Sequence, residues 1–106
     1  MIAGPVEDAV TAISKGDYAT ALPLLRALAE QGNGRAQYNL GFMYTNGHGV
    51  PRDFIRAYMW LSLAVAQDDQ IAAEDRNRIE RRMTPAQLAE ALELAREWKP
   101  TPQLPR

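Results

Sequence analysis

Residue types on which protein chemistry often depends are scarce in this chain. Its 106 residues include no cysteine and a single histidine, His48. The lack of cysteine excludes disulfides, thiolate metal sites and a cysteine nucleophile. A catalytic or metal role for His48 would need converging partners, and the glycines on either side of it supply none. We therefore expect no metal site, no cofactor and no catalytic residue, and we interpret His48 as a loop residue.

The chain also lacks a strong net charge and long apolar runs. Twelve basic and 13 acidic side chains give a net charge of −1, so no strong field attracts nucleic acid or an anionic membrane. No apolar run approaches the ~18–20 residues of a membrane span. We therefore expect neither nucleic acid nor a membrane as a partner. The segment 1–5 shows no export signal, which leaves the cytoplasm as the default compartment and the periplasm as the alternative if a signal peptide was removed.

What the chain does contain is an internal repeat. Segments 17–37 and 53–73 resemble each other with an offset of 36 residues. The matching pairs are Asp17 and Asp53, Ala21 and Ala57, Leu25 and Leu61, Gln31 and Gln67, and Ala36 and Ala72. A fixed period of roughly 20–50 residues is typical of stacked helical repeats, in which neighbouring units bury a continuous core.

Apolar spacing and capping signals predict six helices in three antiparallel pairs, an all-α superhelix. One domain, 1–100, would comprise an N-terminal pair at 5–32, a central full repeat at 34–67 and a C-terminal capping pair at 70–98, followed by a proline-rich tail at 99–106. The expected helices cover about 6–14, 17–31, 35–45, 53–67, 70–82 and 84–98.

Single residues refine these helix predictions. Gly16 suits a left-handed C-terminal cap, and Thr84 with Gln87 predicts a capping box. Pro23 predicts a bend or a local opening in the second helix, but not the loss of the helix. Gly41 lies in mid-helix, where it costs about 1 kcal/mol against alanine, so we expect a neighbouring helix to approach it closely. The sixth helix should bury one stripe of side chains: Leu88, Ala91, Leu92, Ala95 and Trp98.

Residues 36–67, AQYNLGFMYTNGHGVPRDFIRAYMWLSLAVAQ, resemble the Sel-one-like repeat (SLR) family, a bacterial relative of the tetratricopeptide repeat. Segment 70–98 looks like the capping segment of bacterial members, which are often exported. The resemblance implies a right-handed helical superhelix that serves as a protein-interaction scaffold, with the first helices lining its concave face. The signature positions are Ala36, Leu40, Gly41, Tyr44, Gly47, Gly49, Asp53, Ala57, Trp60 and Ala64.

Two sets of residues are candidates for partner binding. On the first helix of the central repeat, opposite its core stripe, lie Arg35, Tyr38, Asn39 and Phe42. Two aromatic side chains at i and i+4, flanked by arginine and asparagine, have the composition of a binding hot spot, although packing against the first or fifth helix explains Tyr38 and Phe42 equally well. The fifth helix is locally basic, and its arginines could bind an acidic partner segment: Arg76, Arg78, Arg81 and Arg82, of which Arg78 and Arg81 are the candidates for partner binding.

We therefore expect a non-enzymatic adaptor that binds a protein or peptide partner on its concave face. The alternative is a homo-oligomerising module, in which the open end of the stack pairs with a second copy to form a homodimer. A small hydrolase or metal enzyme is the third reading, and the sequence offers it no constellation of converging groups.

Overall fold

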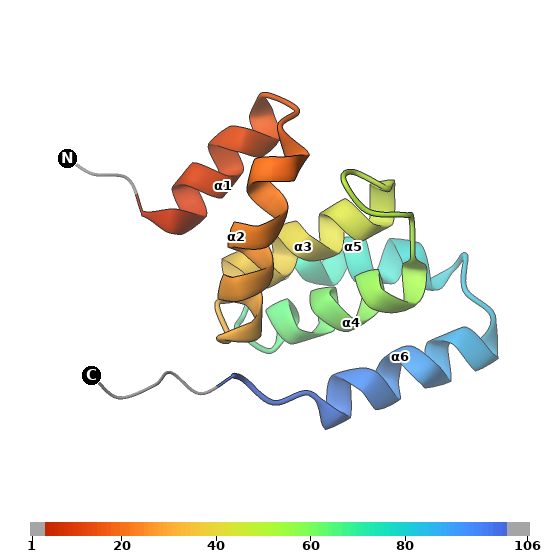
Figure 1. The fold of residues 1–106 in the computed structure, drawn as a ribbon. Helices are drawn as coiled ribbons and strands as arrows, with labels where there is room; N and C mark the ends of the chain where they lie inside the picture. Colours follow the sequence, from red (N-terminus) through yellow and green to blue (C-terminus); the bar gives the residue numbers. More distant parts are fainter. Residues whose placement is uncertain (1–3, 102–106) are drawn as a thin grey trace.

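The computed structural model describes residues 4–101, which form six α-helices and no strand (Figure 1). This confirms the predicted all-helical fold, and the helix ends lie close to the expected ones. Residues 1–3 of the expected domain and residues 102–106 of the expected tail lie outside the described residues. The helices are α1 (Pro5–Ser14), α2 (Tyr18–Glu30), α3 (Gly34–Asn46), α4 (Phe54–Val65), α5 (Gln70–Glu80) and α6 (Pro85–Glu97).

The repeat is visible in how the helices begin. The side chains of Asp17 and Asp53 cap α2 and α4 by accepting a hydrogen bond from the backbone N–H three residues on. Asn33 and Asp69, again 36 residues apart, cap α3 and α5 in the same way. These bonds satisfy N–H groups that have no partner within the helix. The repeat therefore includes the N-terminal caps of the helices as well as their apolar positions.

The helix ends follow the same period. Gly32 ends α2 with a left-handed φ of 96°, and Asp68, its equivalent after α4, adopts φ 66°. A residue with a Cβ pays roughly 1–2 kcal/mol for that conformation, and aspartate is among the side chains that tolerate it best. Gly16 is also left-handed, as predicted, and α2 runs without interruption through Pro23.

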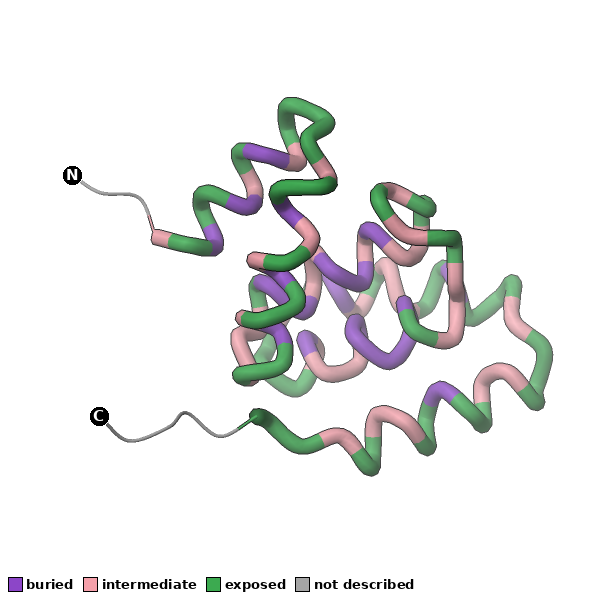
Figure 2. The backbone as a smooth tube through the Cα atoms, in the orientation of Figure 1, coloured by how far each residue is buried: buried purple, intermediate pink, exposed green. Residues whose placement is uncertain are grey.

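The core is centred on α4, which packs on α3, α5 and α6. Figure 2 shows many of the buried positions where α2, α3 and α4 meet, and others along α1 and on α6. The closest approach is at Gly41 of α3, where an added Cβ would lie 2.8 Å from Leu61 Cγ and 3.3 Å from the carbonyl oxygen of Ala57, both on α4. This confirms the close helix contact predicted from a glycine in mid-helix.

The position of α6 differs from the antiparallel pair predicted over 70–98. Both α5 and α6 pack mainly on α4, and α6 turns back along it toward α2 (Figure 1). Its Ala91 is buried, and the Trp98 ring meets the Trp60 ring edge to face with centroids 6.3 Å apart. Among the described residues of α5 only Ala72 and Ile79 are buried, so α5 offers little apolar surface to a second helix.

The stripe predicted for α6 also needs one correction. Leu92 is 50% exposed, whereas Leu88, Leu94, Ala95 and Trp98 are partly buried against the two core clusters. A helix that packs on a single neighbour buries a narrow stripe, and Leu92 lies outside it. The predicted capping box at the start of α6 is present, with Thr84 and Gln87 bonding each other's backbone N–H.

Candidate functional site

A groove with a volume of ≈ 530 Å³ lies between α3 and α5. The α3 side is aromatic and polar, and the α5 side carries charged groups and one isoleucine. Arginine from the loop before α4 and arginine just after α5 complete its border. The lining residues are Tyr38, Phe42, Thr45, Asn46, Arg52, Asp75, Arg78, Ile79 and Arg82.

A hydrogen-bonded group on Asp75 joins the two walls of the groove. The hydroxyl of Tyr38 donates to Asp75 Oδ2 at 3.0 Å, and Arg78 Nη1 donates to Asp75 Oδ1 at 3.0 Å. Burial, followed by the hydrogen bond to Asp75, raises the pKa of Tyr38 to about 12. Tyr38 is therefore a neutral hydrogen-bond donor at physiological pH, and both oxygens of the Asp75 carboxylate already have a partner.

A second tyrosine–carboxylate bond fastens α5 to α4. The hydroxyl of Tyr58 donates to Glu80 Oε1 at 3.0 Å, and the guanidinium of Arg76 lies 5.9 Å from the centre of the Tyr58 ring. Burial and the bond to Glu80 raise the pKa of Tyr58 as well. Together with the Tyr38–Asp75 bond, this contact explains how a helix with few buried apolar side chains is held in a defined place.

Phe42 is held by an aromatic stack that the sequence did not reveal. The His48 ring lies edge to face with Phe42 at 5.8 Å and stacks on Tyr18 of α2 at 4.7 Å. The half-buried His48 thus connects the loop to two helices, which is more than the plain loop residue that we expected. Gly49 permits this approach, because it has φ 76° and an added Cβ would lie 2.8 Å from Tyr18 Cβ.

Two arginines share one aromatic ring at the end of the groove. The guanidinium carbons of Arg52 and Arg82 lie 5.1 Å and 5.0 Å from the centroid of the Phe54 ring, within the range of a cation–π contact. Neither forms an ion pair with a carboxylate of residues 4–101. Sequence analysis placed Arg82 among the basic residues of the fifth helix but missed Arg52 and the arrangement of the two on Phe54, because they are 30 positions apart and no local pattern connects them.

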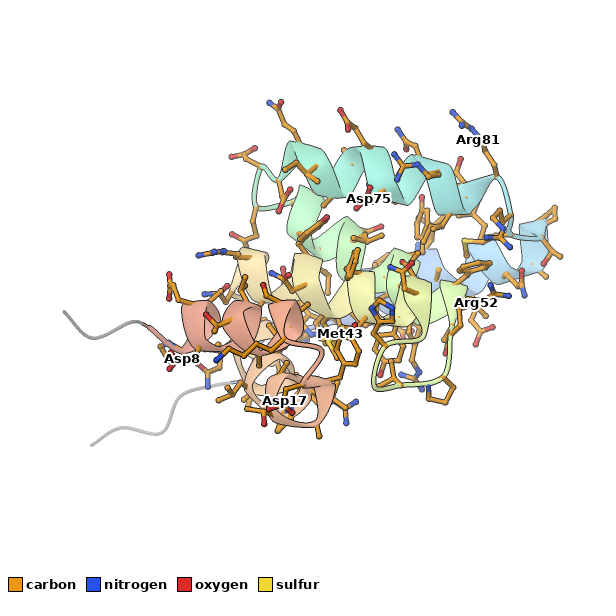
Figure 3. The ribbon with its side chains drawn as sticks, turned by 90° about the horizontal axis from the view of Figure 1, so that it is seen from above. Asp8, Asp17, Met43, Arg52, Asp75 and Arg81 are labelled. Carbon is orange, nitrogen blue, oxygen red and sulfur yellow. The ribbon has the colours of Figure 1, made fainter. Side chains whose placement is uncertain are left out.

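Three of the predicted binding residues lie outside the groove. Arg35 Nη1 pairs with Glu7 Oε1 of α1 at 3.1 Å, and Asn39 Nδ2 donates to the carbonyl oxygen of Arg35 at 2.8 Å. Arg81 is the exposed residue that ends α5, and Figure 3 shows it directed away from α3. Of the predicted set, the structure therefore brings Tyr38, Phe42 and Arg78 together.

The repeat-signature residues occupy structural positions. Gly47 and Gly49 turn the loop with left-handed φ values, and the side chain of Asp53 caps α4. Tyr44 is half-buried, and its hydroxyl accepts a hydrogen bond from Arg26 at 3.4 Å. The buried members of the set are Ala36, Leu40, Gly41, Ala57, Trp60 and Ala64.

No group of three or more histidine, aspartate or glutamate side chains within residues 4–101 is arranged to hold a metal ion. None of the helices in the same range has both the length and the hydropathy that a membrane-crossing segment requires.

Comparison with known proteins connects this geometry to a family. Residues 34–69 match the model of the Sel1 repeat. The chain is similar to the "DAP3-binding cell death enhancer 1" proteins of Rattus norvegicus, at 38% identity over 47 residues, and of Mus musculus, at 40% over 45 residues. These matches cover 44% and 42% of this chain and 9% of each relative. Sel1 repeats generally mediate protein–protein interaction. The resemblance noted in the sequence is thus confirmed over this segment, and the chain carries a Sel1 repeat at residues 34–69.

Proposed function

We propose that this chain is a non-enzymatic interaction module that binds a partner protein in the groove between α3 and α5. The observation that carries this proposal is the pairing of Tyr38 and Phe42 along one wall of a groove of ≈ 530 Å³. Aromatic and arginine side chains are the ones most often found at binding hot spots. The Sel1 repeat supports protein binding as the class of function, and the groove is the surface that we assign to it.

The groove is also arranged in advance of binding. Tyr38 is held by Asp75, and Phe42 is held by the ring of His48. Side chains that are already ordered lose less conformational entropy when a partner arrives, and each immobilised flexible side chain otherwise costs about 0.5–1.5 kcal/mol. A partner can therefore gain contact area on this wall at a low entropic cost.

Site-specific photo-crosslinking in the native cells tests the proposal. A photo-reactive phenylalanine analogue replaces Asn46, an exposed residue of the groove, or Glu90, an exposed residue of α6 that does not line it. We expect discrete adducts with a partner from position 46 and few from position 90. Adducts that form equally at both positions, or only at position 90, would contradict binding in the groove.

A second candidate function is self-association through the end of the stack. Ile71 of α5 is 62% exposed, and α6 packs on α4 and leaves the outer side of α5 uncovered. Light scattering at increasing concentration should then show a dimer that Ile71→Lys converts to a monomer. A monomer of unchanged mass over the whole concentration range would remove this candidate.

A further inference from the structure

We infer that the segment bound in this groove is acidic: a stretch of a partner protein in which aspartate or glutamate adjoins a bulky apolar residue. This inference rests on the proposed function, because it names the chemistry of the partner that the same groove would take. It is carried by the charges of the groove and by the way in which two of its arginines are held.

The groove has an uncompensated positive charge. Three arginines, Arg52, Arg78 and Arg82, and one carboxylate, Asp75, line it. Arg78 and Tyr38 occupy both oxygens of that carboxylate. Arg52 and Arg82 therefore have no acidic partner among the described residues, although the chain as a whole has a net charge of −1. The basic character is local to the groove.

Both guanidiniums contact the ring of Phe54. Both lie about 5 Å from the centre of its ring, so they are at most about 10 Å apart. A contact with the face of a ring leaves the N–H groups of a guanidinium available, and those N–H groups match the two oxygens of a carboxylate. A carboxylate that pairs with either guanidinium would also offset part of the positive charge of the groove.

The neighbouring surface specifies the rest of the segment. Phe42 and the largely buried Ile79 border the same groove, and Phe42 offers an apolar contact beside the arginines. A nucleic-acid backbone would need a continuous row of basic side chains along the groove. Here the acidic Asp75 interrupts that row, because it lies between Arg78 and Tyr38 and is bonded to both. An acidic peptide with one apolar anchor therefore fits both the charge and the hydrophobic part of this groove.

Selection from a random peptide library displayed on phage tests the inference with the intact chain. The selected peptides are synthesised, and their affinities are measured by fluorescence anisotropy for wild type, for Phe42→Ala and for Arg52→Gln/Arg82→Gln. Arg81→Gln is the matched control, because Arg81 is exposed and does not line the groove. Arg52→Lys/Arg82→Lys keeps the charge and loses the bidentate geometry, so it also serves if the glutamine variant is poorly folded.

We expect enrichment of acidic peptides, a loss of at least about tenfold in affinity for the glutamine variant, a smaller loss for the lysine variant and weaker binding at high salt. Arg81→Gln should change the affinity less than about twofold. Enriched peptides that are neutral or basic, and that depend on Phe42 but not on Arg52 and Arg82, would overturn the acidic segment and leave the proposed function standing. No enrichment, or binding independent of Phe42 and both arginines, would overturn both.

Discussion

The contact at Gly41 allows the packing of α3 on α4 to be tested with a single methyl group. Gly41→Ala would place a Cβ 2.8 Å from Leu61 Cγ, 2.9 Å from Leu61 Cδ2 and 3.3 Å from the carbonyl oxygen of Ala57. The Leu61 side chain is fully buried, and the third contact is with backbone. Neither neighbour can move aside without disturbing the core, so the methyl group should overpack it.

Two opposing effects set the magnitude. Overpacking of a well-packed core typically costs about 1–3 kcal/mol, whereas replacing a mid-helix glycine by alanine gains about 1 kcal/mol of helix propensity. We expect Gly41→Ala to lower the free energy of unfolding by about 1 kcal/mol, which corresponds to roughly 4–8 °C in Tm for a domain of this size. Gly41→Leu adds more volume at the same place and should cost considerably more.

Urea unfolding followed by circular dichroism measures this change, and a double-mutant cycle identifies its cause. Leu61→Ala removes both leucine atoms that the new methyl group would meet. In that background Gly41→Ala should be neutral or stabilising, because the cavity accepts the added carbon. If Gly41→Ala stabilises the wild-type protein, or costs the same in both backgrounds, the close-approach argument fails.

Three further predictions concern other contacts. Phenolate absorbance during alkaline titration should show a tyrosine with a pKa of about 12, and Asp75→Asn should move this pKa toward 10. Because the pKa of Tyr38 is raised on folding, its contribution to stability is full below pH 10 and is lost as the pH rises to about 12. Tyr38→Phe should remove this pH dependence. Asp68→Gly should raise the free energy of unfolding by about 0.5–1 kcal/mol, since it removes left-handed strain at some entropic cost, and a lower value in urea unfolding would contradict this. Trp98→Ala should cost about 2 kcal/mol through the lost contact with Trp60 and should speed hydrogen exchange in α6, whereas unchanged exchange would mean that this contact does not hold the helix.

Much of the fold follows from local chemistry that can be read along the chain. Caps such as Asp17, Asp53 and Thr84 act within three residues, so the helix starts that they predict are confirmed. The glycine at position 41 indicated a close contact because its cost in mid-helix needs a reason. The position of α6 was harder to predict, because the spacing of its apolar residues in the sequence is compatible with packing on either α5 or α4. The choice depends on how much apolar surface each helix still offers once the others are packed.

The groove was only partly predictable for the same reason. Tyr38 and Phe42 lie at i and i+4 on one helix, and this spacing is visible in the sequence. The arrangement of Arg52 and Arg82 on Phe54 joins a loop, the start of α4 and the residues after α5. The contacts of the His48 ring with Tyr18 and Phe42 likewise depend on how the loop folds over α2 and α3. Such contacts arise from the tertiary fold, and neither spacing nor composition reveals them.

The wall formed by Tyr38 and Phe42 is the partner-binding surface that we propose. The most direct test of this proposal is to purify the crosslinked partner and measure its affinity for wild type, for Phe42→Ala and for Tyr38→Ala. Glu93→Ala on α6 is the control, and circular dichroism confirms that each variant retains its helices. Anchors of this kind are typically worth about 2 kcal/mol or more, so each groove variant should bind at least about tenfold more weakly, while Glu93→Ala should bind like wild type. Unchanged affinity of the two groove variants with an intact fold would contradict the account.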